Sequence, residues 1–142
     1  MMKYIEWLTG EEMHSQSKQW LSELSFIKIE QQFLDELIKN YTLQLVNSEK
    51  FSGNQNLIST LGNLQSEIEG LFNSVINHEN ELHIMVDGVY QPEEEKKYRK
   101  FHGQIINDLE NYLKNYKVVK KQIFEMIKNI MRSEKPKRIL KQ

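Results

Sequence analysis

Three long stretches of the chain carry apolar residues at alternating steps of three and four, the spacing that places side chains on one face of an α-helix. The middle stretch is the most regular of the three, and its one polar member is His78. Its seam comprises Leu57, Leu61, Leu64, Ile68, Leu71, Val75, His78, Leu82 and Met85. An unbroken seam of this kind predicts a helix that packs lengthwise against partner helices.

A first helix is predicted from about Gly10 to Ser48, because Thr9 and Glu12 have the spacing of a capping box at its start. Its seam comprises Met13, Ser17, Trp20, Leu24, Ile27, Gln31, Leu34, Ile38, Tyr41 and Leu45. A second apolar stripe flanks this seam and comprises Phe26, Ile29, Phe33 and Leu37. The wide apolar face predicts contact with more than one neighbour.

Two further helices are predicted, at about 53–86 and 92–132. Ser52 and Gln55 have the spacing of a second capping box. Pro92 suits the first position of a helix, and three glutamates follow it, where the helix dipole favours negative charge. The third seam comprises Tyr98, His102, Ile105, Leu109, Tyr112, Tyr116, Val119, Ile123, Met126 and Ile130.

These segments predict an all-α fold, an antiparallel up-down-up bundle of three long helices. We expect a single domain at 1–134 followed by a basic tail at 135–142, because Pro136 opposes continuation of the third helix. A homodimer that covers the surplus apolar face would complete the bundle, so self-association is one expectation.

Composition narrows the classes of function. The chain has 142 residues and no cysteine, which excludes disulfides, thiolate metal sites and a cysteine nucleophile. No apolar run approaches the roughly 20 residues that a membrane span needs. Charged residues near the start, Lys3 and Glu6, interrupt the stretch in which a signal peptide would be apolar. We therefore expect a cytoplasmic protein without a membrane span.

Charge is distributed unevenly along the chain, with a net charge of −8 over residues 1–90 and +7 over residues 91–142. The predicted bundle has a basic end that is a candidate for binding anions. Its candidate residues are Lys114, Lys117, Lys120, Lys121, Lys128, Arg132, Lys137 and Arg138. Nucleic acid is the weaker expectation as a partner, because no aromatic residue for base stacking is interleaved with the cations after Phe124.

His78 and His102 lie on two predicted seams, and reflection about Val89 places them at one level of the bundle. Reflection of the first helix about Ser52 puts Phe26 at that level, with Glu23 and Glu30 beside it. Two imidazoles and a carboxylate facing into a bundle form a candidate site for zinc or iron. The alternative is a pair of structural histidines that hydrogen-bond within the core, since polar residues on a seam also set register.

No catalytic constellation is recognisable, because the chain has no phosphate-binding glycine loop and no serine in a recognisable nucleophile setting. We therefore predict a non-enzymatic helical-bundle protein that acts through protein–protein interaction or self-association. Two alternatives are open: a metal-binding bundle that uses His78 and His102, and a protein whose basic end binds nucleic acid or another anionic surface.

Overall fold

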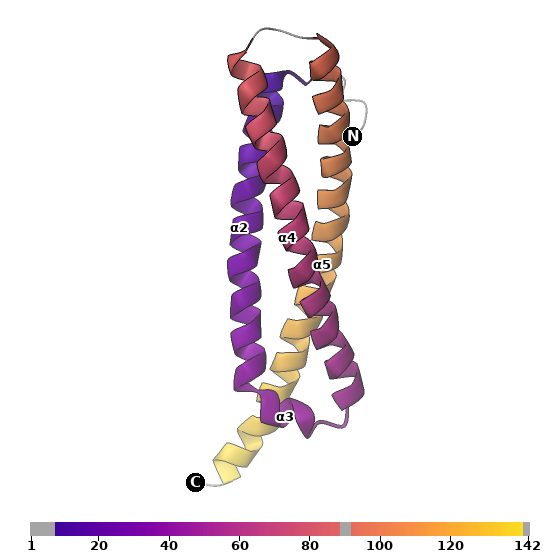
Figure 1. Ribbon diagram of the computed structural model, residues 1–142. Helices are drawn as coiled ribbons and strands as arrows, with labels where there is room; N and C mark the ends of the chain where they lie inside the picture. The colour runs from indigo at the N-terminus through magenta and orange to yellow at the C-terminus, as the bar shows by residue number, and fades with distance from the viewer. Residues whose placement is uncertain (1–7, 89–91, 141–142) are drawn as a thin grey trace.

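Four helices account for the regular structure of the described residues. The computed structural model describes residues 8–88 and 92–140, with side chains at 8–86, 88 and 92–133. The helices are α2 (Gly10–Asn40), α3 (Thr42–Val46), α4 (Phe51–Asp87) and α5 (Pro92–Leu140). Figure 1 shows α2, α4 and α5 side by side with alternating directions, and α3 crossing beneath them. The predicted all-α bundle is confirmed, and no strand occurs within the described residues.

The predicted seams form the core. Each long helix turns its seam toward the other two, and most seam residues lose nearly all contact with solvent. Those that retain no more than 2% exposure include Leu24, Leu34, Leu61, Ile68, Val75, Ile105 and Ile123. Burial of a leucine or isoleucine side chain contributes about 1.5–3 kcal/mol, so these interior layers drive the association of the helices.

The start of α2 follows the capping box that its sequence predicts. The hydroxyl of Thr9 accepts a hydrogen bond from the backbone N–H of Glu12 at 3.1 Å. In return, the carboxylate of Glu12 accepts one from the backbone N–H of Thr9 at 3.3 Å. Two amide groups that a helix start leaves without intrahelical partners are therefore satisfied.

The first connection differs from the sequence prediction, because the predicted helix to Ser48 is broken at Tyr41. Tyr41 leaves helical geometry at φ −115° and ψ 18°, and α3 follows as a single short turn. The hydroxyl of Thr42 donates to the carbonyls of Ile38 and Lys39 at 3.1 and 3.0 Å. Such bonds from a side chain to a preceding carbonyl compete with the backbone ladder and accompany bends.

The start of α4 also lies earlier than predicted. The helix begins at Phe51, and its N-cap residue Lys50 makes no capping hydrogen bond through its side chain. Ser52 and Gln55 therefore lie inside the helix, and the predicted second capping box does not mark its start. The backbone N–H of Phe51 instead donates to the carbonyl of Ser48 at 3.1 Å, which closes the turn into α4.

The third helix is longer than predicted, since α5 continues through Pro136 to Leu140. Proline removes one backbone N–H donor, and this local loss does not end a helix that is already anchored along many turns. The segment predicted as a tail is thus helical up to Leu140, whereas the side chains of Lys137 and Arg138 lie outside the described residues.

The two reversals of the chain set which residues face each other. The ammonium of Lys28 lies 2.9 Å from the carboxylate of Glu69, so the midpoint between α2 and α4 falls between residues 48 and 49. The predicted midpoint at Ser52 was therefore about four positions too late. The residues of α2 beside His78 accordingly lie about seven positions nearer the N-terminus than Phe26.

Candidate functional site

A buried histidine layer joins the three long helices. His78 of α4 and His102 of α5 have no exposed surface, and their rings meet with Nε2 of His78 2.9 Å from Nδ1 of His102. Nε2 of His102 lies 2.8 Å from the amide oxygen of Gln16 on α2. Trp20 stacks on the ring of His102 with centroids 4.5 Å apart, and Phe101 meets His78 edge-on at 5.2 Å.

The hydrogen bonds of this layer run in one direction. The amide oxygen of Gln16 can only accept, so Nε2 of His102 carries a proton and donates it. Nδ1 of the neutral His102 then accepts from the Nε2–H of His78. Nδ1 of His78 is left as a buried acceptor without a partner among the described residues. Both imidazoles are therefore neutral in this arrangement.

Burial makes the charged forms of both histidines unfavourable. It lowers the pKa of His78 to about 4. It also lowers the pKa of His102 to about 3, where the adjacent His78 adds a repulsive contribution. The layer is therefore uncharged at neutral pH, and it would bind protons if the bundle opened.

Two of the four candidate metal ligands lie together in the structure. The structure brings His78 and His102 together, and it does not bring Glu23 or Glu30 to them. Glu23 accepts from Gln19 on its own helix at 3.4 Å. No group of three or more histidine or acidic side chains suited to a metal ion occurs within the described part of the chain. The two histidines form a hydrogen-bonded pair, which is the structural alternative that the sequence left open.

A second polar layer lies further along the bundle. The amide nitrogen of Gln31 donates to the hydroxyl of Tyr112 at 2.8 Å, and that hydroxyl donates to the carbonyl of Leu64 at 2.7 Å. These two bonds tie α2, α5 and α4 together within the core. Burial raises the pKa of Tyr112 to about 12, so the hydroxyl keeps its proton.

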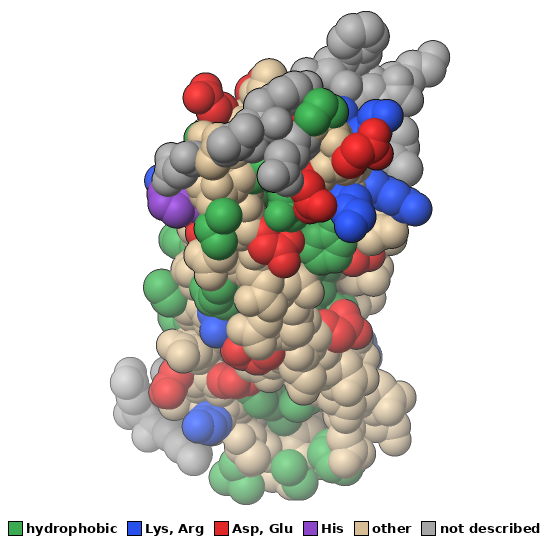
Figure 2. All heavy atoms as spheres, turned by 45° about the horizontal axis from the view of Figure 1, so that its top comes forward, with side chains coloured by type: hydrophobic (Ala, Val, Ile, Leu, Met, Phe, Trp, Pro, Cys, Tyr) green, Lys and Arg blue, Asp and Glu red, His purple; other side chains and the backbone are tan. Residues whose placement is uncertain are grey.

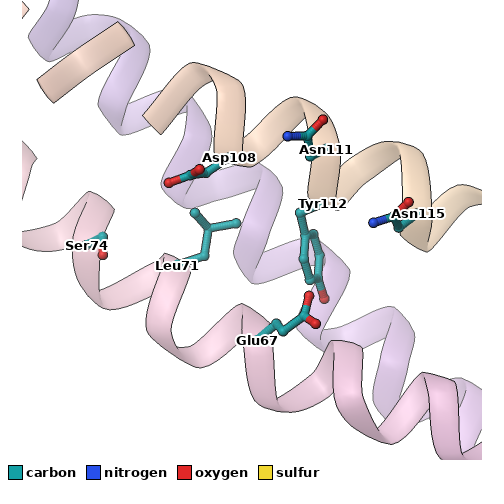
Figure 3. A pocket seen from close by; sticks show the side chains of 7 residues that line it. All are labelled: Glu67, Leu71, Ser74, Asp108, Asn111, Tyr112 and Asn115. Atoms are coloured by element: carbon teal, nitrogen blue, oxygen red, sulfur yellow. The ribbon is translucent and has the colours of Figure 1, made fainter. Parts of the chain in front are cut away.

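A pocket of about 310 Å³ opens beside Tyr112 between α4 and α5 (Figure 3). Glu67, on α4, and Asp108, on α5, contribute carboxylates to its wall. The remaining lining residues are Leu71, Ser74, Asn111 and Asn115. No imidazole lines the pocket among the described residues, so its titratable side chains are the carboxylates of Glu67 and Asp108 and the phenol of Tyr112.

An apolar stripe on α2 faces solvent. Phe26, Ile29 and Phe33 are 66%, 64% and 54% exposed, and we call these three residues the α2 stripe. They succeed one another at steps of three and four, so they occupy one side of the helix over about two turns. Leu37, the fourth member of the predicted stripe, is half-buried against the core, whereas no neighbour within the described chain covers the other three.

A groove lies between α2 and α5 next to this stripe, with a volume of about 480 Å³. Phe26 belongs to both the stripe and the groove. The other lining residues are Ile27, Glu30, Leu113, Tyr116, Lys117, Lys120, Lys121 and Phe124. Most of the exposed lining surface is apolar, and cations stand on the α5 side. We call this feature the α2/α5 groove.

The charge of Glu30 in this groove is already balanced. Its carboxylate accepts from the hydroxyl of Tyr116 at 2.7 Å and lies 3.1 Å from the ammonium of Lys120. Burial and the hydrogen bond to Glu30 raise the pKa of Tyr116 well above its usual range. Lys117 and Lys121 are exposed and form no ion pair within the described residues.

The predicted anion-binding lysines share one side of α5. At about 100° of rotation per residue, five exposed cations fall within a sector of about 60° that borders the groove. We call them the α5 cation stripe: Lys114, Lys117, Lys121, Lys128 and Arg132. Lys120 points away from this sector toward Glu30. Exposed Glu125 lies within about 20° of this sector, so the sector is net positive without being uniformly basic, and it lies alongside an apolar surface.

The glutamates at the opposite end of the bundle have cations close to them. Figure 2 shows acidic and basic side chains interspersed on the end where α2 begins and α5 starts. Arg99 lies 3.0 Å from the carboxylate of Glu95. Lys96 and Lys97 lie 4.0 Å from Glu93 and Glu94. Much of the acidic charge at this end is therefore offset locally.

Sequence reasoning missed the contribution of Gln16 to the histidine layer. Gln16 lies beside the α2 seam, and the misplaced first reversal put it far from His102. Trp20 was assigned to the seam, and its stacking on His102 follows once the reversal is centred correctly. The signal that could have located the reversal is Thr42, whose hydroxyl favours local bonds to the backbone over continuation of the helix.

No helix in the part of the chain that the structure describes has both the length and the apolar character to cross a membrane. Comparison with models of protein families, with curated proteins and with solved structures finds no match for this chain.

Proposed function

We propose that this chain is a non-enzymatic helical bundle that acts by binding another protein through the α2 stripe. The observation that carries the proposal is the exposure of Phe26, Ile29 and Phe33 on consecutive turns of one helix. A contiguous apolar surface in contact with water is unfavourable, and in soluble proteins such surfaces mark sites of interaction.

Two features of the bundle support this assignment. The core is filled by the predicted seams, so these three side chains are surplus to the packing of the chain itself. The stripe also continues into a groove, and a groove offers a partner more contact area than a flat surface does. Large aromatic side chains such as Phe26 and Phe33 are typical anchors of protein interfaces.

Affinity purification from the cells that produce the protein tests this proposal. The bait is compared with a stripe variant, Phe26→Ser with Phe33→Ser, by quantitative mass spectrometry. The matched control is Leu43→Ser with Ile84→Ser, which removes two apolar side chains that are 72% and 71% exposed elsewhere. Far-ultraviolet circular dichroism shows whether each variant keeps its helices.

The proposal predicts proteins that the wild type and the control variant retain and the stripe variant loses. Sedimentation of the purified wild type is run beside the purification, because a second copy of the chain is also a protein partner. Retention of the same proteins by all three baits, together with a monomeric wild type, would contradict the proposal.

A further inference from the structure

We infer that the partner presents an acidic amphipathic helix, which lies along the α2/α5 groove with its apolar side against the α2 stripe. This inference rests on the proposed function, because it names the class of partner that the same surface takes. It follows from the shape, the apolar lining and the charge of the groove.

The shape of the groove fits a helix. Its lining on α5 runs from Leu113 to Phe124, a rise of about 16 Å at 1.5 Å per residue. That length matches about three turns of a partner helix. Apolar side chains at steps of three and four on such a helix would meet Phe26, Leu113 and Phe124 in succession.

The position of the groove favours a fourth helix over other folds. In a four-helix bundle, each helix packs against two neighbours with its apolar side in the space between them. α2 and α5 flank that space here, and Phe26 and Phe124 stand at its two sides with 66% and 41% of their surface exposed. A partner helix would cover both phenylalanines at once.

The positive charge beside the groove favours a partner that carries negative charge. Lys117 and Lys121 line the groove, and neither forms an ion pair within the described residues. The remaining members of the α5 cation stripe extend the same positive sector along the helix. The carboxylate of Glu30 is engaged by Tyr116 and Lys120, so it does not offset this sector. Glutamate or aspartate on the flank of the partner helix would complement these cations.

An anionic membrane would also be attracted to cations beside apolar side chains. The shape of this surface nevertheless argues against a membrane as the partner. A bilayer presents a broad surface, which cannot enter a groove between two helices. Phe26 and Phe124 border the groove, so a convex ligand would contact both, whereas a flat one would leave the floor near Ile27 uncovered. The observations therefore favour a helix.

Designed peptides of about 18 residues test this inference directly. The first peptide carries leucines at heptad spacing with glutamate at the flanking positions, and two matched peptides replace every glutamate by lysine or by glutamine. Binding to the purified full-length protein is measured by fluorescence anisotropy. We expect the acidic peptide to bind at least ten-fold more tightly than the lysine peptide at about 50 mM salt, with the difference shrinking as salt screens the charges.

Variants of the protein separate the contribution of apolar contacts to peptide binding from the contribution of charge. Phe26→Ser with Phe33→Ser is expected to weaken binding of the acidic and glutamine peptides alike. Lys117→Gln with Lys121→Gln is expected to weaken binding of the acidic peptide about five-fold or more and to leave the glutamine peptide unchanged. The control for charge is Lys96→Gln with Lys100→Gln, which removes two exposed cations at the far end of the same helix.

The inference is overturned if the acidic and lysine peptides bind equally, or if none of the three peptides binds. It is also overturned if the wild type dimerises through the stripe, or if it binds phosphatidylserine-containing vesicles in a way that the stripe variant abolishes. When partners from cells still require the stripe and the acidic peptide does not bind, the proposed function stands and this inference alone fails.

Discussion

At the scale of single residues, the two buried histidines are the most unusual groups in the bundle. His78 and His102 are held neutral by burial, and one ring nitrogen of His78 has no hydrogen-bond partner in the part of the chain that the structure describes. A leucine pair at these positions would avoid that cost. The histidines instead pair specifically with each other and with Gln16, which fixes the level at which the three helices meet.

This burial predicts a pH-dependent stability. The folded pKa values of about 4 for His78 and about 3 for His102 lie below the value of 6.5 for an exposed histidine. The unfolded chain therefore binds more protons below pH 6.5, so stability is full above that pH and falls as the pH drops. Each histidine contributes up to about 1.4 kcal/mol per pH unit, a loss of about 2–4 kcal/mol between pH 6.5 and 5.

Urea unfolding at several pH values measures this dependence. His78→Leu removes one of the two buried titrating groups. We therefore expect the unfolding free energy of that variant to change with pH about half as steeply as that of the wild type between pH 6.5 and 5. Val75→Ala, which removes buried methyl groups from the same helix and leaves both imidazoles in place, serves as the control and should keep the full slope. If the unfolding free energy of His78→Leu changed with pH as steeply as that of the wild type, the buried histidines would not be the cause of the pH dependence.

The geometry around His78 and His102 also predicts how zinc affects the thermal stability of the protein. Zinc sites in proteins use three or four ligands, and Glu23 and Glu30, which the sequence suggested as the carboxylates, lie away from the histidine pair. We expect equimolar zinc to leave the Tm of the protein unchanged, as measured by thermal unfolding. A Tm increase of several degrees that His78→Leu abolishes would show that the pair binds metal after all.

At the scale of the elements, the register of the three helices depends on polar bonds inside the apolar seams. Gln31 is 3% exposed, and its amide nitrogen donates to Tyr112. Tyr112→Phe leaves that amide buried without its partner, which we expect to cost about 1–3 kcal/mol of unfolding free energy. The measurement is urea unfolding, with Tyr41→Phe as the control because the Tyr41 hydroxyl makes no hydrogen bond to the described residues. Equal stability of the two variants would contradict this role.

The elements also show what the sequence could and could not predict. Periodicity located the three seams and placed His78 and His102 at one level, since it reports which side of a helix is buried. Capping chemistry located the start of α2 at Thr9. The break at Tyr41 was missed because the apolar period continues across it to Leu45. That error shifted the predicted position of α2 along the bundle axis relative to His102. Gln16 was therefore not recognised as the hydrogen-bond partner of His102.

At the scale of the whole molecule, the apolar residues divide into two sets. One set fills the interior between α2, α4 and α5, and the other is exposed and includes the α2 stripe. Periodicity predicted both sets and could not show which helices cover the second one. The stripe, the groove and the α5 cation stripe lie together on one side of the bundle, and our functional proposal depends on this arrangement.

Site-specific photo-cross-linking in the producing cells tests this claim most directly. A photoreactive phenylalanine analogue replaces Phe33 in one variant and Ile84 in a second, where the side chain is exposed away from the stripe. We predict a cross-linked species at position 33 that is absent at position 84 and that contains a protein other than this 17.0 kDa chain. No cross-link at position 33, or equal cross-linking at both positions, would contradict the assignment of this surface to protein binding.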